Sequence, residues 1–363
     1  MTDDFITRWA DLLVDYCLRV VPGETILVES ELPGRSLVEA CFRSLVLRGG
    51  IPALRLELPG LLEFFLEHAT EAQLAQLPAS GLFDAAAADG RIRIEAETDA
   101  RSMRSIDPAR QAALDRARAP IRQAARRKRW VLTQYPTEAY AAEAGMALDA
   151  YEAFVAKAMF LDRADPAAAW KELGRRQEQL VGFMSKVQTV QVQGPGTDLT
   201  VSVDGRTWIN SDGKRNMPSG EIFTGPLETS ARGRLRSSFP VCRGGREVAG
   251  ITLEFVNGRV VTASAQEGDD YLRAMLDLDP GARFLGELGL GLNYGINRFT
   301  RRILYDEKIG GTAHLALGSS YPETGGTNQS ALHWDLIVDL RTEGRILADG
   351  RVVMENGQWL VLE

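Results

Sequence analysis

The sequence has few of the residues that mark disulfide-bonded, membrane or nucleic-acid-binding proteins. Its three cysteines, Cys17, Cys41 and Cys242, show no CxxC spacing, which favours a reducing compartment. No apolar run approaches the roughly 20 residues that a membrane-spanning helix requires. The formal net charge of -7 argues against nucleic acid as a partner. The acidic start, MTDDFITRWADLL, lacks the basic region of a signal peptide, so we expect a cytoplasmic protein with no membrane partner.

The first half of the chain also lacks a glycine-rich nucleotide-binding motif, because neither GxGxxG nor a Walker sequence occurs there. Its pattern predicts a strand over 25–28, a helix over 34–47 and a strand over 52–58, which together form a βαβ unit. Further strands are expected near 91–95 and 130–134. We therefore predict an open, Rossmann-like α/β domain with a largely parallel sheet and no dinucleotide site.

The pattern changes after residue 187. Short runs of alternating polar and apolar residues, separated by Gly or Asn-Gly turns, predict antiparallel strands and hairpins. The preceding residues, 137–183, are rich in Ala, Glu and Leu and predict helices that connect the halves. We predict an N-terminal α/β domain over 1–184 and a mostly antiparallel β (α+β) metal-binding domain over 185–363, with an inserted helix around 269–277.

Histidine is scarce, and two of the three histidines, His314 and His333, lie close together near the C-terminal end. His333 and Asp335 are two residues apart in a predicted strand, so their side chains share one face while Trp334 points into apolar packing. An imidazole and a carboxylate on one face can bind a divalent metal. We infer that this pair is half of a metal site. His68, near the end of a predicted helix, is more typical of a surface or capping residue.

Two glutamates in apolar surroundings offer the other half of that site. Glu221 lies in NMPSGEIFTGP and Glu287 in FLGELGLGLN, where a carboxylate is costly unless it binds something. Each glutamate alone is also consistent with a turn or surface residue. Together with the two histidines and Asp335, the two glutamates make five candidate ligands. Such a set suits two divalent ions about 3.5–4 Å apart, with Asp335 as the natural bridge. The lack of a cysteine set argues against a closed structural zinc site.

These segments resemble a known family. In chain order, the motifs NMPSGEIFTGP, FLGELGLG, YDEKIGGTAHLALGSSYPETGG and HWD are similar to those of the M29 (aminopeptidase T-like) metallo-aminopeptidases. The resemblance is specific over residues 216–340. It implies a homodimeric hydrolase that removes N-terminal amino acids from peptide or aminoacyl substrates through a two-metal-activated water. It also implies two divalent ions (Zn, Co, Mn or Mg) bound by Glu221, Glu287, His314, His333 and Asp335.

The same resemblance singles out Glu307 in the DE pair and Tyr321 after the ALG segment. We expect Glu307 to be the general base or to orient a ligand, because the metals already engage the other carboxylates. Tyr321 is expected to donate a hydrogen bond to the tetrahedral oxyanion. Without the resemblance, a helix-capping glutamate and a packed tyrosine are equally consistent with the sequence.

Two other functions fit parts of the pattern. Two histidines and one carboxylate also form the ligand triad of mononuclear Fe(II) enzymes, and the scaffold resembles that of ring-cleaving dihydroxypyridine dioxygenases. The presence of both Glu221 and Glu287 argues against that alternative. A non-catalytic binding protein is the third reading. A metal count separates the three, because they require two ions, one iron and no metal, respectively.

Overall fold

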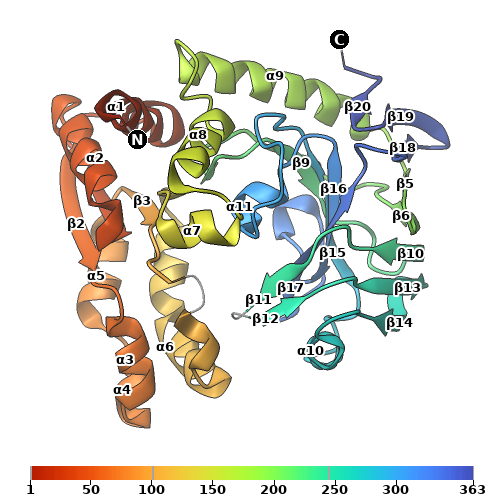
Figure 1. Cartoon of the computed structure of the whole chain (residues 1–363), viewed down its shortest axis with the longest axis horizontal. Helices are drawn as coiled ribbons and strands as arrows, with labels where there is room; N and C mark the ends of the chain where they lie inside the picture. The colour runs from red at the N-terminus through yellow and green to blue at the C-terminus, as the bar shows by residue number, and fades with distance from the viewer. Residues whose placement is uncertain (1, 100–101, 244–245, 363) are drawn as a thin grey trace. The chain divides into compact units, whose positions relative to one another are not determined.

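The computed structural model describes residues 2–99, 102–243 and 246–362 of the chain. The chain forms two compact units, labelled by element in Figure 1. The first unit consists of Met1–Ala169 and Gly213–Pro218, and the second of Trp170–Asp212 and Ser219–Glu363. The predicted division at residue 184 lies at the end of helix α9 (Pro166–Met184), whereas the units divide near its start. Most of the helix belongs to the second unit because its side chains Leu180 and Met184 are part of that unit's apolar core.

The first unit is built on a parallel sheet of order β2-β1-β3-β4-β8. Strand β1 pairs in parallel with both β2 and β3, and β3 pairs in parallel with β4, as the predicted βαβ unit requires. Ile26 and Val28 of β1 are fully buried, which explains the continuous apolar run in this central strand. The strands of this sheet are β1 (Thr25–Glu31), β2 (Ile51–Glu57), β3 (Gly90–Glu95), β4 (Arg129–Gln134) and β8 (Asn216–Met217).

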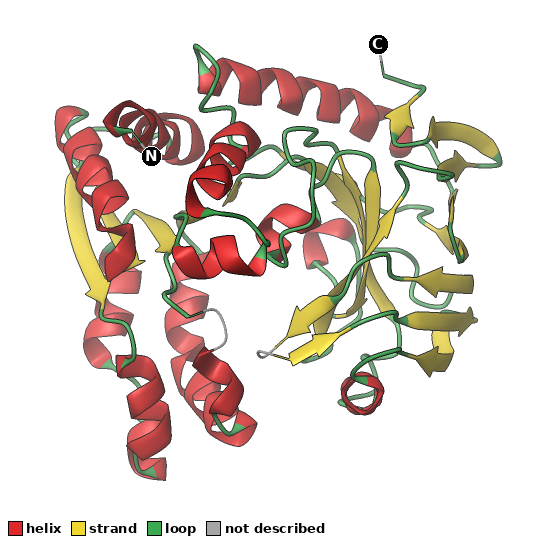
Figure 2. Cartoon of the chain, in the orientation of Figure 1, coloured by secondary structure: helices red, strands yellow, loops and turns green. Residues whose placement is uncertain are grey.

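Helices make up most of the rest of the first unit, as the red ribbons of Figure 2 show. The chain begins with α1, which continues as a π-helical segment over Leu12–Leu18. The helices are α1 (Asp3–Asp11), α2 (Arg35–Leu47), α3 (Leu61–His68), α4 (Glu71–Leu74), α5 (Ala79–Ala87), α6 (Pro108–Arg126), α7 (Glu138–Glu143) and α8 (Leu148–Ala158). Among the described residues, none of the helices is long and apolar enough to cross a membrane.

The second unit consists mainly of antiparallel strands, drawn in yellow in Figure 2. One sheet has the order β14-β13-β10-β6-β5-β18-β19-β20, a second has the order β17-β16-β15-β9-β7, and β11 and β12 form a hairpin. The strands of the first sheet are β5 (Thr189–Gly194), β6 (Thr197–Ser202), β10 (Arg232–Arg236), β13 (Thr252–Val256), β14 (Arg259–Ser264), β18 (Arg345–Ala348), β19 (Arg351–Glu355) and β20 (Gln358–Trp359).

The second sheet carries the five predicted metal ligands. Its strands are β7 (Ile209–Ser211), β9 (Glu221–Thr224), β15 (Leu285–Gly291), β16 (Thr312–Gly318) and β17 (His333–Asp339). The remaining elements of this unit are β11 (Val241–Arg243), β12 (Arg246–Val248), α10 (Asp269–Leu276) and α11 (Ile303–Asp306). On one face of β17, Trp334, Leu336 and Val338 pack into a core that contains side chains from both large sheets. Trp334 was predicted to lie in such apolar packing. The predicted fold class, a parallel α/β region followed by a mostly antiparallel one, is confirmed.

Candidate metal centre

The five predicted metal ligands lie on four neighbouring strands of one sheet. Glu221 begins β9, Glu287 is on β15, His314 is on β16, and His333 and Asp335 are on β17. Directly paired residues of antiparallel strands share a face. Glu287 pairs with Ala316, and Ala316 pairs with Asp335 on its other side. The small Ala316 side chain therefore leaves room for the two carboxylates to approach each other across strand β16.

Both histidines are fixed by a hydrogen bond at Nδ1. His314 Nδ1 lies 3.1 Å from the backbone oxygen of Glu307, and His333 Nδ1 lies 2.9 Å from that of Ser319. A carbonyl oxygen only accepts, so each Nδ1 carries the proton and donates it. This arrangement leaves each Nε2 directed at carboxylates, which is how metal-binding histidines are commonly oriented.

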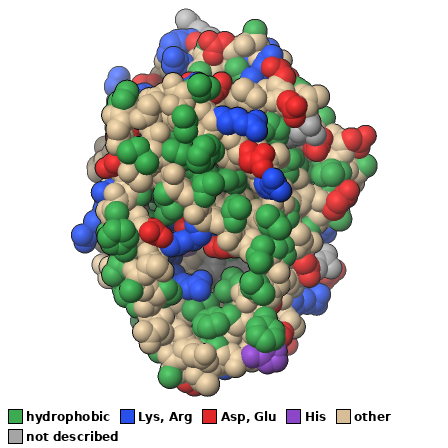
Figure 3. All heavy atoms as spheres, turned by 90° about the vertical axis from the view of Figure 1, so that its left-hand side faces the viewer, with side chains coloured by type: hydrophobic (Ala, Val, Ile, Leu, Met, Phe, Trp, Pro, Cys, Tyr) green, Lys and Arg blue, Asp and Glu red, His purple; other side chains and the backbone are tan. Residues whose placement is uncertain are grey.

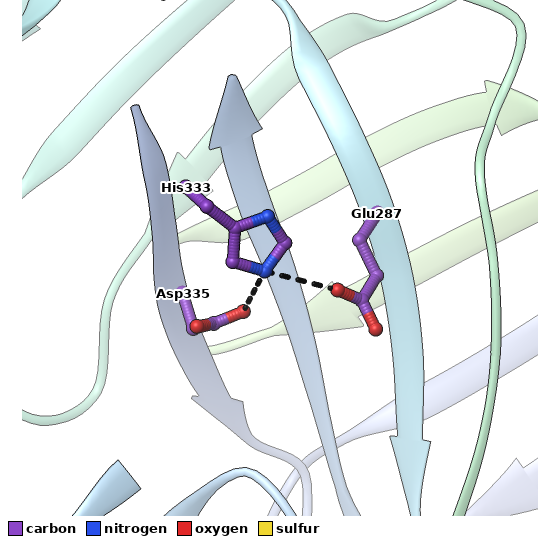
Figure 4. A group of neighbouring side chains, drawn as sticks. All are labelled: Glu287, His333 and Asp335. Carbon is purple, nitrogen blue, oxygen red and sulfur yellow. Dashed lines mark ion pairs between the residues drawn. The ribbon is translucent and has the colours of Figure 1, made fainter. Parts of the chain in front are cut away.

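The side chains form two overlapping groups of candidate ligands. Figure 4 shows the first group, in which His333 Nε2 lies 3.2 Å from Glu287 Oε2 and 3.6 Å from Asp335 Oδ1. The second group consists of Glu307, His314 and Asp335. Within each group the ligand atoms all lie within 4.8 Å of one another. Asp335 belongs to both groups, as a bridging carboxylate would.

Glu221 lies beside the second group. Its Oε2 is 3.6 Å from His314 Nε2, and its backbone oxygen accepts a hydrogen bond of 2.7 Å from Gln177 Nε2. Strand β9 is held against β15 by a pairing of Glu221 with Gly291. The structure therefore brings all five predicted ligands together.

The carboxylates are almost fully buried, and this burial changes their acidity. Burial raises the pKa of Glu221 to about 7 and that of Asp335 to about 6. Burial acts in the same direction on Glu287, but its hydrogen bonds with His314 and His333 outweigh it and lower the pKa of Glu287 to about 2.

The pKa values of the two histidines are also raised, but against the effect of burial. Burial favours a neutral imidazole, but the hydrogen bond with Glu287 and the surrounding negative charge raise the pKa of His314 to about 10 and that of His333 to about 9. This amount of buried negative charge is unfavourable unless cations lie next to it.

The donor set fits divalent metal ions. Glu221 Oε2 and Asp335 Oδ1 are buried and have no hydrogen-bond partner. An unsatisfied buried carboxylate oxygen is costly unless a cation binds it. These two oxygens and the two Nε2 atoms together offer the mixed oxygen and nitrogen donors that divalent transition metals accept.

The two accessory residues lie at the edge of this centre. Glu307 directly follows helix α11 and belongs to the second ligand group, so it is within reach of a metal bound there. The ring of Tyr321 lies 5.4 Å from that of His333 and 5.3 Å from that of Phe223. Partial burial, together with the negative charge of Glu287, raises the pKa of Tyr321, so its hydroxyl stays protonated and able to donate.

Sequence reasoning missed one residue of the centre, Lys308. Its side chain has no solvent exposure, and its ammonium group pairs with Glu307 and lies 3.5 Å from Glu221 Oε1. Burial lowers the pKa of a lysine, but these two carboxylates outweigh burial and raise it. The signal was a single charge that follows Glu307 in the otherwise apolar and glycine-rich segment KIGGTAHLALG.

Comparison with known proteins gives matches to one family, and two of them extend over nearly the whole chain. Residues 2–359 match the family described as thermophilic metalloprotease (M29). The chain is 29% identical to aminopeptidase 2 of Geobacillus stearothermophilus, over 98% of this chain and 97% of that protein. It is 31% identical to aminopeptidase T of Thermus aquaticus, over 55% of this chain and 56% of that one.

A solved structure is also similar. Wild-type AmpT from Thermus thermophilus superposes with a TM-score of 0.85 at 25% identity, over 98% of this chain and 99% of that chain. The family match, the relatives and the solved structure agree, so the resemblance inferred from the motifs is confirmed. The chain belongs to the thermophilic metalloprotease (M29) family and is a metallopeptidase of that family.

Proposed function

We propose that this protein is a two-metal aminopeptidase that removes N-terminal amino acids from peptides. The observation that supports this most directly is the pair of ligand groups that share Asp335. Two ions with one bridging carboxylate are the usual arrangement of two-metal hydrolases. The names of its relatives, aminopeptidase 2 and aminopeptidase T, support an N-terminal site of cleavage.

The residues of the centre divide the work of hydrolysis. A pair of divalent ions bound there supplies activation of water and polarisation of the peptide carbonyl. Glu307 takes the proton of the attacking water at a carboxylate oxygen and delivers it to the departing amine. The Tyr321 hydroxyl donates a hydrogen bond to the oxygen that gains negative charge in the tetrahedral transition state. The ring contact between Tyr321 and His333 holds that hydroxyl at the edge of the ligand set.

The same residues determine which ions fit. We propose two divalent ions per chain from the group Zn, Co, Mn and Mg. Imidazole nitrogen suits zinc and cobalt, and the surplus of carboxylates also accommodates manganese and magnesium. The mononuclear dioxygenase alternative is not favoured, since Glu221 and Glu287 both join the site and the relatives are named as aminopeptidases.

A substrate panel tests the aminopeptidase assignment. Purified protein loaded with Zn²⁺, Co²⁺ or Mn²⁺ is incubated with dipeptides, aminoacyl amides and the same compounds N-acetylated. We expect hydrolysis of the substrates with a free α-amine and at least about a hundredfold slower hydrolysis of the acetylated ones. A site that binds the α-amine discriminates strongly against a substrate in which that amine is blocked. Equal hydrolysis of both sets would show a metallopeptidase without N-terminal specificity.

We further propose that the protein is a homodimer. Strand β2 is the edge strand of the parallel sheet, with β1 as its neighbour in that sheet. Exposed edges with apolar side chains are ready sites of pairing. Ile51, Leu54 and Leu56 of β2 are about half exposed, Leu47 of α2 is 82% exposed and Phe64 of α3 is 62% exposed. Figure 3 shows many hydrophobic side chains on the face of the chain that carries these elements.

Light scattering after size exclusion tests this dimer. We expect the mass of two chains for the wild type and of one chain for the Leu54→Lys variant. Val256→Lys, at a position of similar exposure in the second unit, is the matched control and should remain dimeric. A wild-type protein that is monomeric at high concentration contradicts the proposal.

A cytoplasmic location is the last part of the proposal. The three cysteines form no disulfide with one another in the described part of the chain, and two of them, Cys17 and Cys41, are buried. Free thiols are typical of a reducing compartment. Fractionation of the source cells should recover the protein with cytoplasmic markers, and recovery with an exported fraction would overturn this part.

A further inference from the structure

The metal centre contains a cation of its own, the ammonium group of Lys308. The side chain is fully buried, it pairs with Glu307, and its Nζ lies 3.5 Å from Glu221 Oε1. Burial of an ammonium is expensive, so its carboxylate partners hold it there as a charged group. The predicted two-metal mechanism assigns no task to this charge.

The backbone keeps this ammonium in place. The Lys308 N–H donates a 3.0 Å hydrogen bond to Tyr305 O, and Lys308 O accepts a 3.1 Å hydrogen bond from Asn293 N. A Cβ at Gly291 would lie 3.0 Å from the Lys308 carbonyl carbon, so strand β15 packs directly on this segment. With its backbone held on both sides and its side chain enclosed, Lys308 has no open route into solvent.

The Lys308 ammonium contacts carboxylates on one side of the centre, those of Glu221 and Glu307. Lys308 pairs with Glu307, which belongs to the group that also contains His314 and Asp335. In the other group, the ion-pair partners of Glu287 are the two histidines, His314 at 3.5 Å and His333 at 3.2 Å. A metal ion bound beside Glu307 by Glu221, His314 and Asp335 would therefore share its surroundings with the Lys308 ammonium, whereas the ion pairs of Glu287 are with the two histidines.

A count of formal charges points the same way. Four carboxylates, those of Glu221, Glu287, Glu307 and Asp335, line the centre. Two divalent ions alone balance four negative charges. With two ions bound, the Lys308 ammonium therefore leaves the centre with one positive charge in excess. With one ion bound, the ion and the ammonium together leave one negative charge unbalanced. The second ion is thus the one whose binding Lys308 opposes.

We propose that Lys308 makes the two metal positions unequal, weakening the ion held beside Glu307 by Glu221, His314 and Asp335 so that it exchanges while the ion held by Glu287, His333 and Asp335 is retained. This inference rests on the proposed two-metal function. It assigns Lys308 a positioning and electrostatic role toward the metals, and no contact with the substrate.

Metal titration of the full-length chain tests the inference. Chelator-treated wild-type, Lys308→Gln and Lys308→Met proteins are titrated with Mn²⁺ alone in a calorimeter, and folding of each is checked by circular dichroism. The glutamine variant keeps a hydrogen-bond donor for Glu307 and loses the charge, while the methionine variant keeps the approximate volume of the side chain. Lys186→Gln removes an exposed lysine of the same unit and is the matched control.

We expect the wild type to bind two ions with dissociation constants that differ by at least about tenfold, since a fixed like charge nearby costs more than about 1.4 kcal/mol at protein dielectric values. In Lys308→Gln the weaker constant should tighten by at least about tenfold, and the tighter constant should change by a smaller factor, because the Coulomb interaction falls with distance. Lys186→Gln should bind as the wild type does.

Three results overturn the inference, and they differ from a failure of the proposed function. Equal affinities for two ions in the wild type, or unchanged constants in both Lys308 variants, show that Lys308 does not distinguish the positions. Loss of the second ion in the variants shows that Lys308 instead holds Glu221 and Glu307 in place for the metal. All three leave the two-metal function intact, whereas a wild type and variants that bind no ion overturn both.

Discussion

Gly289 lies directly opposite His314 on the paired strands β15 and β16, and a Cβ at position 289 would lie 2.0 Å from His314 Cε1. The imidazole therefore lies over the bare backbone of the glycine. This contact lets His314 Nε2 reach both Glu287, on the neighbouring strand β15, and Glu221, on the next strand β9. A glycine in the middle of a strand is unfavourable by itself, so its presence here serves the position of the histidine.

Gly289→Ala should displace His314 and weaken metal binding at the group that contains it. We expect about 10–100-fold weaker binding of one ion, a comparable loss of hydrolysis, and a stability loss of about 1–3 kcal/mol from overpacking. Metal titration and urea unfolding measure these effects.

The matched control is Gly182→Ala. Gly182 lies in helix α9, where an added Cβ meets nothing within 4 Å, so alanine should bind metal normally and unfold at equal or higher urea concentration. If Gly289→Ala bound both ions with wild-type affinity, the close packing of His314 would not matter for the centre.

His333→Ala and Asp335→Asn should each abolish hydrolysis while the protein remains folded. Both side chains are candidate ligands, so their loss should lower the rate at least about a hundredfold. This is more than the usual effect of replacing a residue that only hydrogen-bonds to a metal ligand. The readouts are hydrolysis of an aminoacyl amide and the far-ultraviolet circular dichroism spectrum. His68→Ala, which changes an exposed histidine of the first unit, should keep full activity. Full activity in either ligand variant would make the assignment wrong.

Tyr321→Phe separates the hydroxyl from the ring. Phenylalanine keeps the packing against Phe223 and His333 but cannot donate to an oxyanion. We expect kcat to fall by about 10²–10³-fold with KM changed little, because the hydrogen bond forms only in the transition state. Steady-state kinetics measure both constants. A lower affinity for substrate at unchanged kcat would instead assign Tyr321 to substrate binding.

Asp306 should give the protein a pH-dependent stability. Its Oδ1 accepts hydrogen bonds of 2.8 Å from both the N–H and the hydroxyl of Thr300, and burial raises its pKa to about 8 from an ordinary value of 3.8. Between these two values the folded state holds a proton that the unfolded state has lost. Stability from this group is therefore full at acid pH and declines as the pH rises toward about 8.

Asp306→Asn keeps an oxygen that accepts from Thr300 and removes the proton. Its free energy of unfolding, measured with urea from about pH 5 to about pH 8, should decline less steeply than that of the wild type. Thr7→Ser, a conservative change at an exposed hydroxyl of the first unit, should keep the wild-type slope. An identical slope in Asp306→Asn would show that Asp306 is already ionised in the folded protein.

Local patterns predicted much of this molecule. The alternation of HWDLIVD correctly placed Trp334 in the core and the side chains of His333 and Asp335 together on the opposite face, because strand periodicity depends only on neighbouring residues. The βαβ unit was predictable for the same reason. The convergence of Glu221, Glu287 and the histidines depends on strand register, which their motifs suggested only through resemblance to a family. That these residues bind metal stays a prediction.

Other features depend on contacts distant in sequence. Lys308 approaches Glu221 because β9 and β15 pair beside the segment after α11, and no local pattern records that pairing. The unit to which α9 belongs was equally unpredictable from local sequence. Its composition predicts a helix but does not indicate which apolar core Leu180 and Met184 pack into. Glu307 was expected beside the metals, and its position within the second ligand group could not be derived from its neighbours.

The central claim is that hydrolysis requires two divalent ions in the centre formed by Glu221, Glu287, Glu307, His314, His333 and Asp335. The most direct test measures bound metal per chain by mass spectrometry and hydrolysis of an aminoacyl amide in the same samples, during stepwise reloading of chelator-treated protein. We predict negligible hydrolysis in the depleted protein and full hydrolysis at two ions per chain. Full hydrolysis in the depleted protein, or a maximum at one ion per chain with no change on further binding, would contradict the account.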